Sequence, residues 1–167
     1  MNIVFLDYDG VVNTPMWNED GTHCCYNFPS DNKVNNFQAV QWVSEFCQKY
    51  GYSIVVSSTW RMDKNYKECL INGGLRDGIE ILGRTPFCDA KIDGKTGYCV
   101  TRGVEIEQYL EDHPEVDEYL IFDDEDGLWE YQMEHLVLTD GTVGFTMNDF
   151  NKAVQLHDKF KETFKEV

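Results

Sequence analysis

Short apolar runs alternate along the chain with longer segments in which apolar residues recur every three or four positions. A short run closed by turn residues predicts a buried strand, whereas the longer spacing predicts a helix with one apolar face. Strands that alternate with helices in this way form a parallel sheet with right-handed crossover connections. The pattern therefore predicts an α/β fold. The predicted strands span residues 3–6, 53–56, 79–85, 119–122 and 136–138.

Capping and breaking residues indicate where the predicted helices begin and end. Ser30 or Asp31 is a good N-cap for the first helix, and Gly51 supplies its C-terminal stop. The run from Thr146 to Asp149 has the form of a capping box and opens the last helix. In chain order, the predicted helices span residues 31–50, 66–72, 104–113 and 146–165.

Polar residues close three of the predicted strands, and the carboxyl ends of parallel strands meet at the sheet edge where ligands bind. Alternate side chains of a strand share a face, so Asp7 and Asp9 would point into one crevice. Gly10 would let the backbone turn sharply and lie close to a ligand. Carboxylate and hydroxyl oxygens suit Mg²⁺. The strand-end residues are Asp7 and Asp9, Ser57 and Ser58, and Asp123 and Asp124.

Composition and charge narrow the range of functions. The chain has 167 residues, of which 42% are hydrophobic, and this suits one globular domain with a core of its own. The formal net charge of −16 at pH 7 gives a surface that repels the nucleic-acid backbone and anionic membranes. A phosphate-bearing ligand must therefore be held by a local site or a metal. This excludes an extended nucleic-acid footprint but allows action on one nucleic-acid end.

We expect a single domain over residues 1–167, with a flap at 13–30 and a small insertion region at 73–101. Neither excursion is long enough to form a large cap over the strand ends. The six cysteines contain no Cys-x-x-Cys pair, and no apolar run approaches membrane-spanning length. We therefore expect reduced thiols in a soluble cytoplasmic protein without a signal peptide.

The strand ends carry motifs that resemble those of the haloacid dehalogenase (HAD) superfamily of phosphohydrolases. Phe5–Val11 resembles the first motif, Val55–Ser57 the second, and Ile121–Asp124 the fourth, in its paired-aspartate form. These motifs follow one another in the family's order across nearly the whole chain. Two further runs, Ser57–Arg61 and Thr101–Ile106, are similar to a small capless branch that includes domains associated with RNA-repair proteins.

The resemblance implies a Rossmann-like three-layer sandwich around a central parallel sheet, without a large cap, and a phosphatase mechanism. Asp7 would be the nucleophile and form an aspartyl-phosphate. Asp9 would protonate the leaving oxygen and then activate a water molecule, and Ser57 would hydrogen-bond a phosphoryl oxygen. Mg²⁺ would bind the Asp7 carboxylate, the Asp9 backbone carbonyl and one or both of Asp123 and Asp124.

The third motif of the superfamily usually provides a lysine, and no lysine stands in the matching place. Arg102 opens the helix before the 119–122 strand and fits that place in the narrower branch. A guanidinium fork also matches the oxygens of a phosphate. Lys91 and Lys95 are the alternatives. The remaining residues that we expect to contact substrate are Gly10, Ser58 and Arg61, the last because related polynucleotide phosphatases have an arginine soon after the second-motif serine.

The sequence thus predicts a Mg²⁺-dependent phosphomonoesterase. Its substrate would be a nucleotide, a nucleic-acid end or a phosphoprotein, because capless members of the superfamily tend to admit bulky phosphorylated ends. Two alternatives remain open. One is a phosphate-binding or signalling module with little or no turnover, which would not need Asp9. The other is a metal-dependent nuclease, which would use the same carboxylates to cut phosphodiesters.

Overall fold

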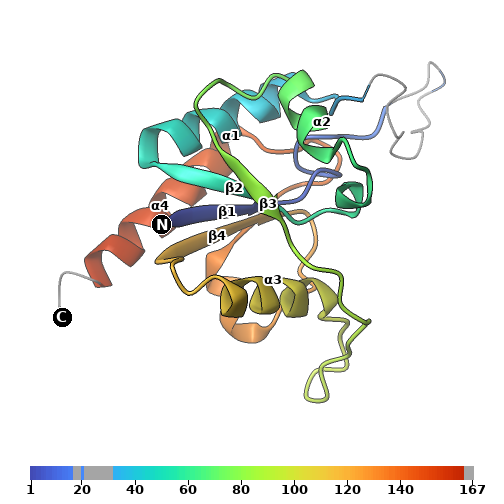
Figure 1. Ribbon diagram of the computed structural model, residues 1–167, viewed down its shortest axis with the longest axis vertical. Coiled ribbons are helices and arrows are strands. Elements are labelled where there is room, and N and C mark those ends of the chain that lie inside the picture. Colours follow the sequence, from blue (N-terminus) through green and yellow to red (C-terminus); the bar gives the residue numbers. More distant parts are fainter. Residues whose placement is uncertain (17–19, 21–31, 164–167) are drawn as a thin grey trace.

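In the computed structural model, residues 1–16, 20 and 32–163 are described. Within them, strands pair in parallel to form one sheet with the order β3-β2-β1-β4-β5. This arrangement confirms the α/β fold with a central parallel sheet (Figure 1). The strands are β1 (Asn2–Leu6), β2 (Tyr52–Val56), β3 (Ile81–Arg84), β4 (Glu118–Asp123) and β5 (Leu136–Leu138).

Helices cover both faces of the sheet, so that the fold has three layers. Figure 1 shows α1 and α2 on one side of the sheet and α3 on the other. The alternating side chains of β1 serve the two layers, because Val4 and Leu6 belong to one apolar core and Ile3 and Phe5 to the other. The helices are α1 (Phe37–Tyr50), α2 (Tyr66–Asn72), α3 (Thr101–Asp112) and α4 (Met147–Thr163), with short 3₁₀ helices η1 (Thr59–Met62) and η2 (Glu130–His135).

The strand register decides which residues meet at the carboxyl edge of the sheet. Leu6 of β1 is paired with Val56 of β2 and with Phe122 of β4. The residues that follow these three are Asp7, Ser57 and Asp123, so they share one row across the sheet. Backbone hydrogen bonds extend the pairing by one residue on each side, from the Asp7 N–H to the Phe122 carbonyl (3.0 Å) and from the Ser57 N–H to the Leu6 carbonyl (2.9 Å).

The largest departure from the predicted elements is the start of α1. The helix begins at Phe37, and its N-cap is Asn36, whose side chain accepts a hydrogen bond from the Ala39 N–H (3.0 Å). Ser30 and Asp31, the predicted caps, lie outside the described residues. Val34 follows the apolar spacing of the helix but lies before it, where its N–H bonds the carbonyl of Cys69 (3.0 Å). A tertiary contact therefore replaces the predicted first turn.

The last helix begins as predicted. The Thr146 N–H donates to the Asp149 carboxylate (2.9 Å), and the Asp149 N–H donates back to the Thr146 hydroxyl (3.4 Å). These reciprocal bonds confirm the capping box. The helix reaches Thr163, the last described residue.

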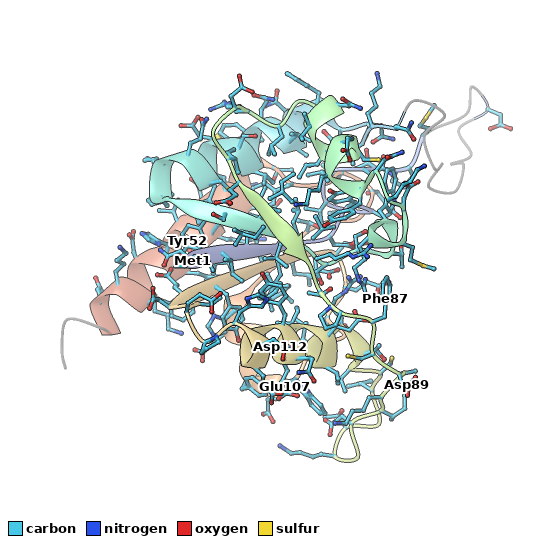
Figure 2. The ribbon with its side chains drawn as sticks, in the orientation of Figure 1. Met1, Tyr52, Phe87, Asp89, Glu107 and Asp112 are labelled. Carbon is cyan, nitrogen blue, oxygen red and sulfur yellow. The ribbon has the colours of Figure 1, made fainter. Side chains whose placement is uncertain are left out.

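A buried polar cluster lies at the opposite edge of the sheet, where the strands begin. Tyr52 of β2 donates a hydrogen bond to Glu118 of β4, and its hydroxyl lies 3.0 Å from Nδ1 of His157 on α4. The same histidine nitrogen lies 3.1 Å from a Glu118 oxygen. All three side chains are buried, and Tyr52 lies beside Met1 at this edge (Figure 2). The cluster fastens α4 to two strands that flank β1.

The two predicted excursions are described unequally. Most of the flap at 13–30 lies outside the described residues. The insertion region at 73–101 includes β3, which belongs to the sheet, so only the connection from 85 to 100 lies outside the sheet and its helices on this side of α3. Within the described part of the chain, no helix has the length and apolar character needed to span a membrane. The cysteines described there, Cys47, Cys69, Cys88 and Cys99, are free.

Candidate functional site

The site is formed at the carboxyl edge of the sheet by the ends of three neighbouring strands, β2, β1 and β4. Asp7 follows β1, Ser57 follows β2, and Asp123 is the last residue of β4. Their exposed fractions are 6%, 1% and 1%. The convergence predicted from the apolar runs is therefore present, and it places polar side chains in a largely water-excluded setting.

An acidic cluster forms the centre of the site. Asp7, Asp123 and Asp124 each offer a carboxylate oxygen, and these oxygens lie within 4.8 Å of one another. Burial, followed by the charge of Asp123, raises the pKa of Asp7 well above its usual range. Burial likewise raises the pKa of Asp123 to about 6. Carboxylates this close and this buried resist ionisation together, and a divalent cation between them would remove that resistance.

The chemistry of the cluster fits Mg²⁺, which prefers hard oxygen ligands from a small number of carboxylates. Gly10 supports this fit from the side of the backbone. It has a φ of +79°, and a Cβ at this position would lie 2.3 Å from the Asp124 carboxylate carbon. The Asp124 carboxylate thus lies in space that any side chain at position 10 would fill. The Gly10 carbonyl is fixed in turn by a hydrogen bond from the Thr139 hydroxyl (2.8 Å).

Arg102 brings a positive charge to this acidic cluster. The Arg102 guanidinium donates to the Ser57 carbonyl and, at 3.2 Å, to the Ser57 hydroxyl. Its Nη2 lies 3.7 Å from an Asp7 oxygen, and its Nε lies 3.3 Å from an Asp123 oxygen. Burial alone would lower the pKa of Arg102, but the negative charges of Asp7 and Asp123 outweigh it and hold the pKa above its ordinary value. Arg102 is therefore a fixed positive charge inside the site.

The alternative cations have other partners. The Lys95 ammonium pairs with Glu130 at 2.8 Å, in a fully solvated position, and the Lys91 ammonium lies 5.0 Å from the centre of the Trp129 ring. Of these three candidates, Arg102 is the one that lies against the acidic cluster.

Asp9 lies beside the acidic cluster without joining it. Its carboxylate is half-buried and accepts a hydrogen bond from the Asn13 amide (2.8 Å). Its charge is close enough to contribute to the raised pKa of Asp124, after burial and the charge of Glu125. The described carboxylates that could share an ion do not include that of Asp9.

Ser58 and Arg61 are both buried, which changes how their predicted contacts with substrate are understood. The Ser58 hydroxyl hydrogen-bonds the Asp7 carboxylate and also accepts a hydrogen bond from the Trp60 N–H (3.4 Å). Its contacts are therefore with the protein, and one of them helps to orient Asp7. The Arg61 side chain is paired with Glu105 at 2.7 Å and is only 4% exposed. The structure does not present Arg61 as a free phosphate ligand.

Two residues near the site were not predicted from the sequence. Thr139 follows β5, and the strand-end pattern that selected Asp7 and Ser57 would have found it. Glu105 lies one helical turn after Arg102 and within the Thr101–Ile106 run that resembles the capless branch, and these were the signals that could have found it. Neither residue stands out by type, because the chain has thirty acidic residues and threonines are common at strand ends.

Comparison with known proteins places this site in a family. No curated protein and no solved structure shows significant similarity to the chain. The family model described as "HAD domain in Swiss Army Knife RNA repair proteins" matches residues 3–150. That match includes the whole sheet except Asn2, together with the acidic cluster and Arg102. The chain therefore belongs to the family of HAD domains found in Swiss Army Knife RNA repair proteins.

Proposed function

We propose that the protein is a Mg²⁺-dependent phosphomonoesterase that works through an aspartyl-phosphate on Asp7. The observation that carries this proposal is the meeting of three carboxylates, two buried and one half-buried, with the Arg102 guanidinium at a single sheet edge. The family supports the same reaction class, because a HAD domain implies a phosphohydrolase.

The proposed nucleophile is the Asp7 carboxylate. One of its oxygens accepts a hydrogen bond from the Tyr8 N–H (2.8 Å), and the Ser58 hydroxyl adds another. These bonds fix the direction of attack on phosphorus. A carboxylate and a phosphate charge about 4 Å apart repel by about 4 kcal/mol at an effective dielectric near 20. Bound Mg²⁺ would supply the positive charge that offsets this repulsion and keeps Asp7 ionised.

Arg102 and Asp9 take the remaining roles. The Arg102 guanidinium is oriented by Ser57, Asp7 and Asp123, and its planar fork suits the oxygens of a transferring phosphoryl group. Asp9 is half-buried and is oriented by a hydrogen bond from Asn13. It lies near Asp7 but is not part of the acidic cluster. It would give a proton to the leaving oxygen and then take one from the attacking water.

We further propose that the substrate is a phosphate at the end of a nucleic acid or on a nucleotide. The RNA-repair context of the family supports this class. The net charge of −16 disfavours a footprint that extends along a nucleic-acid strand. A terminal phosphate could be bound by the local positive charges of Arg102 and the metal alone, and it fits a site without a large cap.

The test is phosphate release from a panel, with Mg²⁺ or with a chelator. The panel holds mononucleotides, oligonucleotides phosphorylated at either end, phosphopeptides and a generic aryl phosphate. We expect Mg²⁺-dependent release, with preference for the terminal nucleic-acid phosphate. Asp7→Asn should lower kcat at least 1,000-fold, which is on the order expected for loss of a catalytic nucleophile. The matched control is Asp89→Asn, an exposed aspartate outside the site, which should stay within about twofold of wild type.

Other outcomes would select other functions. Turnover that survives Asp7→Asn would remove Asp7 as the nucleophile. A phosphate that stays on Asp7 for hours would favour the signalling module. Cleavage of phosphodiesters with monoesters left intact would favour the nuclease.

A further inference from the structure

Arg61 and Glu105 form a buried ion pair behind the site. Arg61 Nη2 lies 2.7 Å from Glu105 Oε1, and the two side chains are 4% and 8% exposed. Removing two charges from water is costly, so a buried pair adds little to stability in comparison with an apolar pair of the same size. Such a pair fixes the relative positions of the groups that it contacts. The hydrogen bonds of Arg61 and Glu105 identify the segments that are held in this way.

Arg61 joins the segments that follow β2 and β3. Its Nη1 donates to the carbonyl of Ser58 (2.8 Å), and its Nη2 donates to the carbonyl of Pro86 (3.3 Å). The guanidinium also lies over the ring of Phe87, 4.3 Å from its centre, and Figure 2 shows Phe87 on the far side of the molecule from Tyr52. Arg61 thereby holds the loop that carries Ser57 and Ser58. The charge of Arg61 is neutralised by Glu105, which belongs to α3.

Glu105 brings α3 into the same assembly. It lies one turn after Arg102 on this helix, and its Oε1 also accepts a hydrogen bond from the Cys88 N–H (3.4 Å). The two arginines repel each other, since the charge of Arg102 contributes, after burial, to a lowered pKa of Arg61. Glu105 is a carboxylate whose charge raises the pKa of both arginines, as the charge of Asp7 also does. It therefore lets two guanidinium groups lie near one another at the end of the helix.

The first turn of α3 depends on contacts of this kind, because no side chain caps it. On its other flank, the Gly103 N–H donates to the Gly127 carbonyl (3.0 Å), and the Gln132 amide donates to the Gly103 carbonyl (2.9 Å). A Cβ on Gly103 would lie 2.5 Å from the Gln132 oxygen. The turn is thus clamped between η2 on one side and the Arg61–Glu105 pair on the other, with Arg102 between them.

We propose that Arg61 and Glu105 are positioning residues, which hold the first turn of α3 so that the Arg102 guanidinium stays on Ser57, Asp7 and Asp123. Only the link to turnover rests on the proposed function. The position of Arg102 does not.

The kinetic test uses Glu105→Gln, which keeps the size of the side chain and removes its charge. We expect kcat/KM to fall about 10- to 100-fold, the usual loss when a residue that orients a catalytic group is replaced. In an Arg102→Ala background, the same substitution should lower kcat/KM by less than about twofold, because there is no guanidinium left to orient. An effect of equal size in both backgrounds would show a general structural role and overturn the proposal.

Two further variants make this test specific. Glu130→Gln breaks the exposed pair with Lys95, so it is the matched control and should leave kcat/KM unchanged. If Glu105→Gln does not fold, as judged by circular dichroism, the double variant Arg61→Met/Glu105→Leu replaces the pair with apolar side chains of similar volume. This variant should fold and still lose turnover about 10- to 100-fold, and full turnover in it would also overturn the proposal.

A second readout needs no turnover. The Arg102 Nε–H lies against Asp123, and its NMR signal can be assigned by its loss in Arg102→Ala. Glu105→Gln should speed exchange of this proton with water at least tenfold, whereas unchanged exchange overturns the proposal. If exchange speeds up in a protein that releases no phosphate, the proposed function fails and the positioning role stands. If phosphate release is normal and exchange does not change, the positioning role fails and the proposed function stands.

Discussion

Raising the pH of the metal-free protein should destabilise it, because Asp123 must ionise in a buried position beside Asp7. Burial raises the pKa of Asp123 to about 6 in the folded protein, whereas an unfolded aspartate titrates near 3.9. Between these values the folded state binds more protons than the unfolded state. The stabilisation is therefore complete below a pH of about 4 and is lost as the pH rises through 6.

The magnitude follows from the size of the shift. A displacement of about two pKa units corresponds to about 3 kcal/mol when the whole titration is crossed. Between pH values of about 5 and 8, about half of this, on the order of 1–2 kcal/mol, should be lost from the free energy of unfolding. Asp7 acts in the same direction, since burial and the charge of Asp123 raise its pKa as well.

Urea unfolding in the presence of a chelator, at these two pH values, measures the effect. The control is Asp123→Asn, which cannot ionise and should lose less stability over the same interval, by about 1–2 kcal/mol. The comparison cancels the self-repulsion of a chain with a net charge of −16, which also grows with pH. At the higher pH, Mg²⁺ at about 100 times its Kd should add about 2.7 kcal/mol to the wild type. Parallel losses in the two proteins would refute the reasoning.

The remaining predictions concern the metal cradle and the core. Gly10→Ala should weaken Mg²⁺ binding at least tenfold in calorimetric titration, on the order of 1.4 kcal/mol, because its methyl group would displace Asp124, whereas Gly94→Ala has open space and should bind as wild type. Phe46→Ala should lower the free energy of unfolding by about 3–5 kcal/mol, since Phe46 is buried among four other rings. Phe37→Ala, at a 61% exposed position, should cost no more than about 1 kcal/mol in urea unfolding.

The centre of the sheet could be predicted because β1, β2 and β4 are almost entirely buried and therefore mostly apolar. Runs such as 3–6 and 119–122 mark β1 and β4 without ambiguity, and the polar residue after each run marks the carboxyl edge. Parallel pairing then brings Asp7, Ser57 and Asp123 together without any knowledge of the register. This part of the site is encoded locally, strand by strand.

The parts that could not be predicted depend on contacts between distant segments. Val34 has the apolar spacing of a helix, yet the carbonyl of Cys69 captures its N–H, and α1 begins later. Arg61 was predicted to contact substrate, and nothing in the sequence indicated that Glu105, far along the chain, pairs with it in the interior. Periodicity reports which face of an element is apolar, and it does not identify the partner of a buried charge.

The polar cluster at the start of the strands limits where the chain can be truncated. The family match ends at residue 150, but Ala153 and His157 lie farther along α4 and are buried. A fragment trimmed to the match would uncover the core beneath α4 and leave Glu118 without its histidine. The smallest piece that retains the native packing therefore extends through the last turns of this helix, and expression boundaries are better drawn from these contacts than from the extent of family similarity.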